Sequence, residues 1–354
     1  MSSVLDDPET YSKMDPDGML KAITEFPKSA RNALNNTKKV DINIDGSTYD
    51  SIIITGMGGS AVGGLLLRDW LLDTLKIPVD VSRGYHLPAW VNKKTLVYAV
   101  SYSGNTEETL SQYMEAVKLG CTVVCFCSGG KLEQLAKENH QTLVYFPKGQ
   151  QPRAAIPYQF YNLAGITRRT GLIDDAKWDE VNESIEVVEI MCNEMNQEVS
   201  SDVNRGKQLA TEIKDFVPFI YAPRLFESVA YRYSTQFNEN SKSPAATNFY
   251  PEAFHNSVMA REGAEEILGG LCAVIIHDPK EYPRLNKKIK VSVELMEETF
   301  GKVIMVEAKG ESNLARMMSA LIQGDYASAY LGLLYGIDPS TTESIKILKA
   351  SMEN

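Results

Sequence analysis

The chain has 354 residues, which is enough for two domains of ordinary size at roughly 100–200 residues each. Its composition, 44% hydrophobic and 23% charged, is typical of a globular protein, and no apolar run reaches the roughly 18 residues that a membrane-spanning helix needs. The net charge of −10, without a basic block, argues against a nucleic acid partner, although a local group of N–H donors and cations can still bind a small anion. The start of the chain is acidic and has no apolar core, so we expect no signal peptide and a cytoplasmic protein.

The five cysteines form no recognisable disulfide or metal-binding pattern. Their number is odd, no CxxC pair occurs, and the four histidines stand far apart in the chain. We therefore predict buried, reduced thiols and no metal site.

The first half of the chain alternates predicted strands and helices. The β-branched run at 51–55 predicts a buried parallel strand, and a glycine-rich turn and a helix follow it. A second helix is predicted over 106–119, where Gly120 provides a stop signal. Four further strands are predicted at 79–82, 95–101, 121–127 and 142–146. This alternation indicates a parallel sheet with helices on both faces.

The second half repeats this order of elements after a mostly helical, acidic stretch. Its strands are predicted at 216–222, 271–277 and 302–308, and its helices at 225–240, 285–300, 314–335 and 342–351. We therefore predict an α/β fold with two doubly wound parallel-sheet domains in tandem, each a three-layer αβα sandwich. The expected boundaries are 20–157 for the first domain, 158–214 for the helical connection and 215–354 for the second domain with its C-terminal helix.

The first candidate site is the glycine-rich turn GMGGSAVGG at 56–64. Glycines let the backbone approach a ligand closely, and the following helix offers unpaired N–H groups and partial positive charge. Gly58, Gly59 and Ser60 are therefore candidates to bind an anion such as a phosphate group. The structural alternative is a tight turn that only packs the helix against the sheet.

A dinucleotide-binding turn is a further alternative at the same place. Gly56, Gly58 and Ala61 match the fingerprint G-x-G-x-x-A, and Asp80 lies near the position of a ribose-binding acid. However, Asp80 falls inside its predicted strand rather than at the end. An oxidoreductase that uses NAD or NADP would follow from this match alone.

The second candidate site is the turn SYSGNTEET at 101–109. Ser101, Ser103 and Thr106 supply three hydroxyls around a flexible Gly104, and either Asn105 or Thr106 is placed to cap the next helix. A capped helix with polar decoration is the structural alternative. Because both turns follow strands of one parallel sheet, we expect them at its carboxyl edge, where such sheets bind ligands. A dinucleotide fold does not require the second turn.

With these two turns, the chain resembles the bifunctional phosphoglucose/phosphomannose isomerases of archaea and bacteria, which belong to the phosphoglucose isomerase superfamily and contain two sugar isomerase (SIS) domains. Three later segments strengthen the likeness, which covers the chain from about residue 20: PRAAIP at 152–157, NENSK at 238–242 and the segment around His255-Asn256. The resemblance implies isomerisation of glucose 6-phosphate, and of mannose 6-phosphate, to fructose 6-phosphate through a cis-enediol. It also implies no metal, no cofactor, and a homodimer with shared active sites.

The resemblance assigns roles to individual residues. The positions that match those binding the sugar phosphate are Gly59, Ser60, Ser101, Ser103 and Thr106. Glu239 matches the catalytic base, and Arg153 matches the cation that stabilises the enediolate. His255 matches the group that opens the sugar ring, which the family supplies from the neighbouring subunit. Without the resemblance, each of these three would be interpreted as an ordinary surface or loop residue.

Two positions near the C-terminus complete the implied site. Lys349 matches a lysine near the ring oxygen, although Lys346 lies on the same helical face. Thr342 matches a small threonine that leaves room for either configuration at carbon 2 of the sugar.

A non-catalytic sugar-phosphate sensor is the second functional hypothesis. SIS domains also occur in regulators, and a sensor needs only the two turns. The sequence contains no recognisable DNA-reading segment, which argues against a transcriptional regulator.

Overall fold

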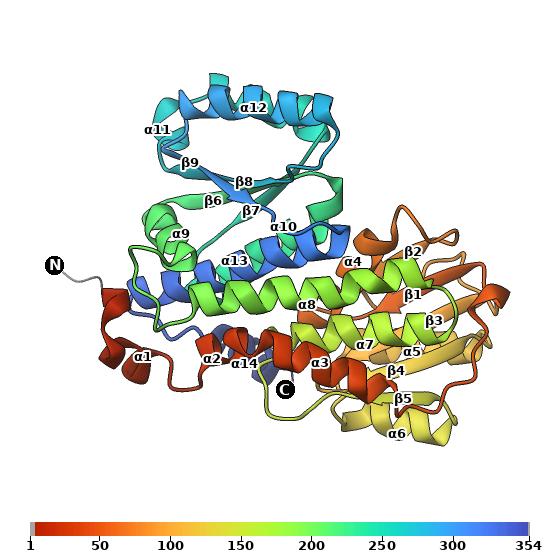
Figure 1. Ribbon diagram of the computed structural model, residues 1–354. Helices are drawn as coiled ribbons and strands as arrows, with labels where there is room; N and C mark the ends of the chain where they lie inside the picture. The colour runs from red at the N-terminus through yellow and green to blue at the C-terminus, as the bar shows by residue number, and fades with distance from the viewer. Residues whose placement is uncertain (1–3, 353–354) are drawn as a thin grey trace. The chain divides into compact units, whose positions relative to one another are not determined.

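The computed structural model describes residues 4–352, which form two compact units with one parallel sheet each (Figure 1). The five-stranded unit comprises Phe26–Glu186 and Ser312–Ala315. The four-stranded unit comprises the described residues up to Glu25, Val187–Glu311, and those from Arg316 on. Two parallel sheets with flanking helices confirm the predicted fold class. The predicted connection at 158–214 contributes residues to both units.

The sheet of the five-stranded unit has the strand order β2-β1-β3-β4-β5, and all its neighbours are parallel. The two central strands, β1 and β3, are buried at every position, which explains why they are continuous apolar runs in the sequence. The five predicted strands of this half are all present: β1 (Ser51–Thr55), β2 (Val79–Ser82), β3 (Thr95–Ser101), β4 (Thr122–Cys127) and β5 (Thr142–Tyr145).

Helices cover both faces of this sheet. On one face, Val97 and Ala99 of β3 pack with Tyr113 of α5 in a core that α6 also joins. On the other face, the Tyr98 hydroxyl accepts a 3.2 Å hydrogen bond from Thr167 of α7. Helix α7 also packs against α3 and α4. The helices are α3 (Phe26–Thr37), α4 (Gly59–Leu71), α5 (Glu107–Lys118), α6 (Gly130–Glu138) and α7 (Ile156–Arg169), with a 3₁₀ turn η2 (Gly46–Thr48).

The four-stranded sheet repeats the same connectivity with one strand fewer. Its order is β7-β6-β8-β9, so the second strand of the unit again lies outside the first. The sequence does not predict β7, because its four residues, ATNF, show no alternation of apolar and polar side chains. In the structure all four are half-buried, which explains why this pattern is missing. The strands are β6 (Val217–Ala222), β7 (Ala246–Phe249), β8 (Leu271–His277) and β9 (Lys302–Glu307).

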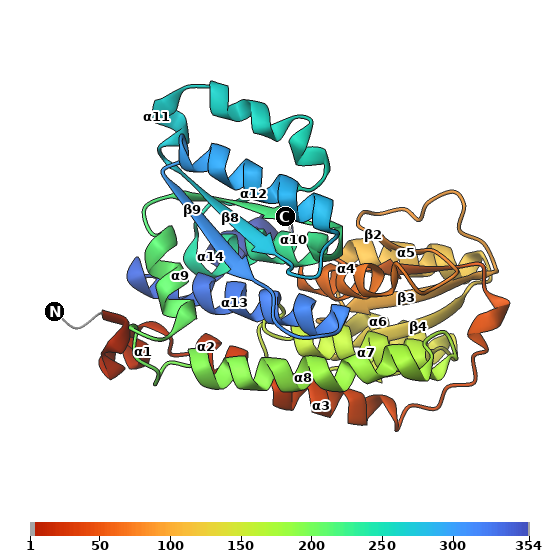
Figure 2. The ribbon, with the colours of Figure 1, turned by 45° about the horizontal axis from the view of Figure 1, so that its top comes forward.

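This second sheet also lies between helical layers (Figures 1 and 2). Helix α12 packs Ile289 and Met296 against Ala273 and Ile275, while α10 contacts β6 and β7 from the other face. The helix predicted at 225–240 is α10 continued by a π-helical turn, η4. The helices are α1 (Pro8–Met14), α2 (Met19–Thr24), α9 (Arg205–Ile213), α10 (Glu227–Gln236), α11 (Glu265–Leu268), α12 (Pro283–Glu297) and α14 (Glu343–Met352). The shorter turns are η1 (Val4–Asp6), η3 (Arg224–Phe226), η4 (Phe237–Ser241), η5 (Glu252–Phe254) and η6 (Ser257–Glu262).

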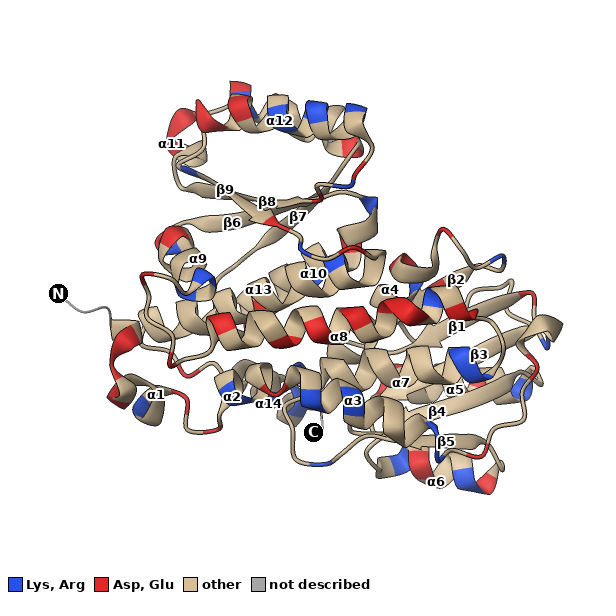
Figure 3. Ribbon diagram, viewed as in Figure 1, with Lys and Arg blue, Asp and Glu red and all other residues tan. Residues whose placement is uncertain are grey.

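Two long helices contribute residues to both units, α8 (Asp175–Met195) and α13 (Asn313–Leu334). The acidic residues of the predicted helical connection gather along α8, as Figure 3 shows. No helix within residues 4–352 is long and apolar enough to cross a membrane.

All five cysteines are buried, which confirms that part of the prediction, and none of them forms a disulfide in the structure. Burial raises the pKa of the Cys127 thiol to about 11, so the reactive thiolate form is rare near neutral pH. Within residues 4–352, no three His, Cys, Asp or Glu side chains are grouped as metal ligands would be.

Candidate active site

The two polar turns predicted from the sequence lie next to each other in the five-stranded unit. They follow the carboxyl ends of β1 and β3, which are adjacent in the sheet and lie where the strand order reverses. Open parallel sheets bind ligands at this point, because the connections on either side leave opposite faces of the sheet. A hydrogen bond joins the turns directly, since the Tyr102 N–H donates to Ser60 Oγ at 3.2 Å.

The glycine-rich turn leaves the start of α4 without a side-chain cap. Gly58 occupies the N-cap position with φ of +52°. The space next to its Cα is empty, because an added Cβ would meet no atom within 4 Å. Gly59 starts the helix, and a Cβ there would lie 3.0 Å from the carbonyl oxygen of Pro152. The first N–H groups of a helix have no partner within it. The turn therefore offers backbone donors at the carboxyl edge of the sheet.

The hydroxyl-rich turn is shaped by its own side chains. Ser101 Oγ accepts a 3.0 Å hydrogen bond from the Gly104 N–H and lies 2.9 Å from Thr106 Oγ1. Ser103 Oγ accepts from the Asn105 N–H at 3.2 Å. Ser103 is exposed, and a hydroxyl that accepts a hydrogen bond keeps its own proton to donate. The turn is thus preorganised and still able to donate to an anion.

The structure decides which side chain caps which helix. Thr106 stands at the N-cap position of α5, but its side chain makes no capping bond and instead meets Ser101. Asn105 caps the next helix, because its Oδ1 accepts a 2.9 Å hydrogen bond from the Lys131 N–H in the first turn of α6. Neither side chain therefore caps α5, the helix for which the sequence suggested them.

Arg153 lies beside the glycine-rich turn. Its side chain is buried, with 2% exposed, in the turn that leads into α7. That turn contacts Gly59 through Pro152, whose carbonyl oxygen also accepts a 3.0 Å hydrogen bond from Gln159 Nε2. The structure thus groups Arg153 with the predicted anion-binding residues of the same unit.

Glu239 lies in the four-stranded unit, on the π-helical turn η4. It is half-buried, and the next residue anchors the turn, since Asn240 Nδ2 donates to Ser328 Oγ at 2.9 Å. Gly332 allows α13 to approach, because a Cβ there would lie 2.7 Å from the Asn240 carbonyl oxygen. Single π-helical turns within helices are frequent at functional sites.

Thr342 and the two candidate lysines also lie in the four-stranded unit. Thr342 is half-buried directly before α14. Lys346 and Lys349 are both exposed on α14, and Lys346 pairs with Glu343 at 2.8 Å, an ion pair that raises the pKa of Lys346. The choice of Lys349 as the lysine near the ring oxygen stays a prediction.

His255 is exposed at the end of η5, on the segment that follows β7. Its backbone N–H donates to the Glu252 carbonyl oxygen at 2.9 Å. The residues that belong to the four-stranded unit are Glu239, His255, Thr342 and Lys349. Those that belong to the five-stranded unit are Gly58, Gly59, Ser60, Ser101, Ser103, Thr106 and Arg153.

Two residues that the sequence does not single out hold these segments. The Tyr102 hydroxyl donates to the Pro147 carbonyl oxygen at 2.7 Å and accepts from the Gln150 N–H at 3.0 Å, so it fixes the segment before Arg153. Lys242 Nζ donates to the Glu239 carbonyl oxygen at 2.6 Å. Neither role has a sequence signal, because a tyrosine between serines suggests only core packing and a lysine after a helix suggests only solvation.

The strand order argues against the dinucleotide alternative. The five-stranded sheet has the order 2-1-3-4-5, whereas dinucleotide-binding sheets have 3-2-1-4-5-6. Asp80 lies within β2 and is exposed, and its Oδ1 accepts from the neighbouring Val81 N–H at 2.8 Å. A ribose-binding acid would instead stand at the end of this strand.

Comparisons with known proteins agree with this architecture. A family model of the SIS domain matches residues 47–160, and a model described as the bacterial phospho-glucose isomerase C-terminal SIS domain matches residues 202–352. Fold and turns together define a protein with two SIS domains in tandem. The solved C-terminal domain of glucosamine-fructose-6-phosphate aminotransferase from Francisella tularensis has the same fold, with a TM-score of 0.74 at 17% identity over 91% of this chain and 98% of that chain.

Curated relatives identify the family of SIS-domain proteins to which the chain belongs. The bifunctional phosphoglucose/phosphomannose isomerase of Caldicellulosiruptor bescii is 38% identical over 332 residues, which cover 94% of this chain and 98% of that protein. The bifunctional phosphoglucose/phosphomannose isomerase of Aquifex aeolicus is 33% identical and covers 93% of this chain and 98% of its own. The chain belongs to the bifunctional phosphoglucose/phosphomannose isomerase family, which confirms the resemblance seen in its motifs.

Proposed function

We propose that this chain isomerises glucose 6-phosphate and mannose 6-phosphate to fructose 6-phosphate. The observation that carries the proposal is the pair of donor-rich turns at the switch point of the five-stranded sheet, in a chain that belongs to this isomerase family. Such turns suit a phosphate group, and the family name supplies the two sugars.

The phosphate group is held by the start of α4 and by the hydroxyl-rich turn. Gly58, Gly59 and Ser60 supply backbone and hydroxyl donors, and the positive end of the helix dipole favours the negative charge. The hydroxyls that complete this set are those of Ser101, Ser103 and Thr106. Since the phosphate does not react, its binding energy serves to orient the sugar.

Glu239 acts as the base. Its carboxylate removes the proton from carbon 2 of the open aldose and returns a proton to carbon 1 on the same face of the cis-enediol. A proton also moves from the hydroxyl on carbon 2 to the oxygen on carbon 1, so the aldose and the ketose contain the same atoms. Arg153 stabilises the negative charge that develops on the enediolate oxygen. Before this step the sugar ring must open, which requires a proton on the ring oxygen. His255 supplies this proton, and Lys349 acts beside the ring oxygen. Thr342 leaves room for either configuration at carbon 2, which admits both aldoses.

The proposed active form is a cytoplasmic homodimer. In this arrangement His255 comes from the second copy, as the family resemblance implies. Five buried, unpaired thiols are consistent with the reducing cytoplasm.

A non-catalytic sensor would need only the two turns and would leave Glu239 without a purpose. The relatives that span nearly the whole chain carry the names of enzymes, which favours the isomerase. A coupled assay for fructose 6-phosphate formation from each aldose phosphate separates the two hypotheses. We expect activity with both substrates, unchanged by a chelator.

Glu239→Gln is the sharpest test of the proposed base. The amide keeps the size of the side chain but accepts no proton, so we expect kcat to fall by about 10²–10⁴-fold while sugar-phosphate binding persists. Glu138→Gln, at the exposed end of α6, is the matched control and should match the unaltered protein. Near-normal turnover in Glu239→Gln would show that another group is the base.

A further inference from the structure

Lys242 ends the π-helical turn in a conformation that lysine rarely adopts. Its φ is +55°, in the left-handed region that favours glycine and asparagine, and its backbone N–H donates to the Phe237 carbonyl oxygen. A glycine would satisfy this backbone at less cost in free energy. The backbone conformation therefore does not explain a lysine at this position, which indicates a role for its side chain.

The Lys242 side chain joins two segments that are about one hundred residues apart in the chain. Its ammonium group has three protons and faces three carbonyl oxygens: Glu239 at 2.6 Å, Thr341 at 2.9 Å and Asp338 at 3.4 Å. Carbonyl groups at the end of a helix lack intrahelical partners, so the first of these contacts also caps η4.

The second segment is a compact turn that determines the position of Thr342. Within it, Asp338 Oδ1 accepts a 2.7 Å hydrogen bond from the Ser340 N–H, and Thr341 Oγ1 donates to the Asp338 carbonyl oxygen at 3.1 Å. The Thr342 carbonyl oxygen accepts the first bond of α14, from the Ile345 N–H at 3.1 Å. The hydrogen bonds of Lys242 to residues 338 and 341 therefore also restrict the position of Thr342, the next residue in the chain.

We propose that Lys242 is a positioning residue that holds the base Glu239 in a fixed relation to Thr342, without contacting the substrate. This inference rests on the proposed function, because it assigns Lys242 a role in that same reaction. Without the ammonium group, η4 and the turn at 338–342 lose the hydrogen bonds that join them through this side chain, so their relative position is less tightly fixed. A displacement of about 1 Å in a catalytic group can cost about 10²-fold in rate. The phosphate-binding turns belong to the other unit, so substrate binding is largely retained.

Three variants test the proposal, compared in kcat, KM and the ratio of rates on glucose 6-phosphate and mannose 6-phosphate. Lys242→Gly suits the backbone but removes the side chain, Lys242→Met removes the charge, and Lys242→Arg keeps it. We expect the first two to lower kcat by about 10–100-fold with KM changed by less than about threefold, and to alter the substrate ratio. Arginine should restore most of the rate. His140→Gly is the matched control, since His140 is exposed with φ of +54°, and should leave all three quantities unchanged.

The possible results separate this inference from the proposed function. If the unaltered protein fails to isomerise either sugar, the proposed function is wrong. If it is active and both Lys242→Gly and Lys242→Met keep its kcat and substrate ratio, the inference about Lys242 is wrong while the function stands. A lower kcat with an unchanged ratio and no recovery in Lys242→Arg would indicate a purely structural cap and would also overturn it. Should Lys242→Gly not fold, Lys242→Met decides.

Discussion

Gly104 is the residue on which the hydroxyl-rich turn depends most directly. Its φ is +71°, and a Cβ at this position would collide with the carbonyl oxygen of Gly129. Its own carbonyl oxygen accepts a 2.8 Å hydrogen bond from the Leu132 N–H of α6. Both the backbone conformation and the available space therefore require glycine, and the positions of Ser101 and Ser103 depend on it.

Alanine substitutions at two glycines separate the free-energy cost of a positive φ from the cost of a steric clash. Gly104→Ala adds a clash with backbone to the cost of a positive φ, so we expect a loss of about 2–4 kcal/mol in the free energy of unfolding. Gly120 has φ of +74° after α5, but a Cβ there meets no atom within 4 Å, so Gly120→Ala should cost about 1 kcal/mol. Urea denaturation measures both. Equal losses would mean that the turn at Gly104 relaxes to accept a side chain.

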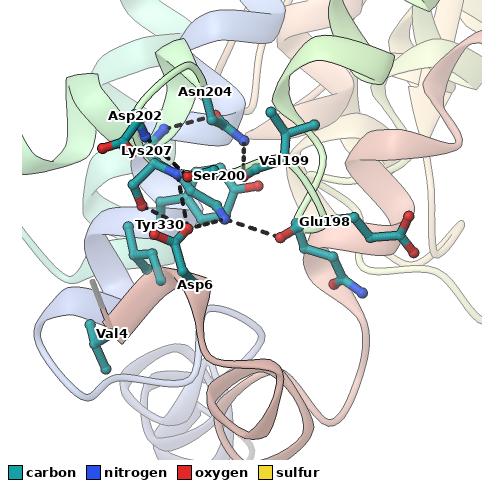
Figure 4. Close-up of polar contacts among 12 residues, drawn as sticks. Val4, Asp6, Glu198, Val199, Ser200, Asp202, Asn204, Lys207 and Tyr330 are labelled. Atoms are coloured by element: carbon teal, nitrogen blue, oxygen red, sulfur yellow. Dashed lines mark hydrogen bonds and ion pairs between the residues drawn. The ribbon is translucent and has the colours of Figure 1, made fainter. Parts of the chain in front are cut away.

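At the scale of elements, η1 is attached to the helical part of the four-stranded unit by one carboxylate (Figure 4). Asp6 Oδ1 accepts 2.9 Å hydrogen bonds from the backbone N–H and the hydroxyl of Ser201, and it pairs with Lys207 Nζ at 3.1 Å. The Lys207 side chain is 1% exposed and lies 5.8 Å from the centre of the Tyr330 ring. A buried ammonium group needs such partners, so this contact fixes a segment whose role is not evident from the sequence.

The same contact predicts a pH-dependent stability. Burial acts to raise the pKa of Asp6, but the hydrogen bonds from Ser201 and the contact with Lys207 outweigh it and hold the pKa below its ordinary value of 3.8. A carboxyl group with a lowered pKa in the folded state stabilises the fold above the unfolded-state pKa, and the stabilisation is lost as the pH falls through the folded-state pKa.

Asp6→Asn should therefore destabilise the protein at neutral pH. We expect a loss of about 1–3 kcal/mol, less than for a fully buried pair because 25% of the Asp6 side chain is exposed. The difference from the unaltered protein should shrink as the pH falls below about 4. Glu9→Gln, which removes an exposed pair with Lys13, is the control and should cost about 0.3–0.5 kcal/mol. A pH-independent difference for Asp6→Asn would show that the carboxylate charge is not the cause.

At the scale of the whole molecule, the two units repeat one connectivity but not one site. Strand β3 ends in Ser101, at the start of the hydroxyl-rich turn, whereas β8, in the same place of its sheet, ends in His277. Asp278 follows and is buried in a 2.9 Å ion pair with Arg316. The repeated fold thus carries donor-rich turns in one unit and an internal charge pair in the other.

The proposed shared site predicts complementation between two inactive variants. Glu239→Gln and His255→Ala should each be nearly inactive as pure proteins. If His255 acts in the site of the second copy, a mixed dimer contains one site with both native residues. After equal amounts are unfolded and refolded together, activity should return to about a quarter of that of the unaltered protein, since half of the dimers are mixed.

Light scattering on the same samples reports the oligomeric state. Glu239→Gln mixed with Glu239→Gln/His255→Ala is the control, because no native carboxylate at position 239 remains. Persistent inactivity of the first mixture, with dimers present, would place both residues on one chain.

The sequence by itself determined the two turns and, within residues 4–352, every strand except β7. Runs such as TLVYAVS and LCAVIIH are apolar because central parallel strands are buried on both faces, and this is a local property. The turns were equally evident, since the glycines and hydroxyls that form each one lie within nine consecutive residues. Parallel pairing then brings the ends of neighbouring strands to one edge, so the meeting of Ser60 with the hydroxyl-rich turn follows once β1 and β3 pair.

Only the tertiary structure decided what depends on residues far apart in the chain. The short strand β7, the π-helical turn of Glu239 and the contacts of Lys242 with Asp338 and Thr341 have no local signal. Their partners lie on other strands, on α13 or before α14, and a side chain that donates to distant carbonyl groups leaves no pattern at its own position. Packing against distant segments overrides local preference at such places, because burial and hydrogen bonding there outweigh the fractions of a kcal/mol that propensity supplies.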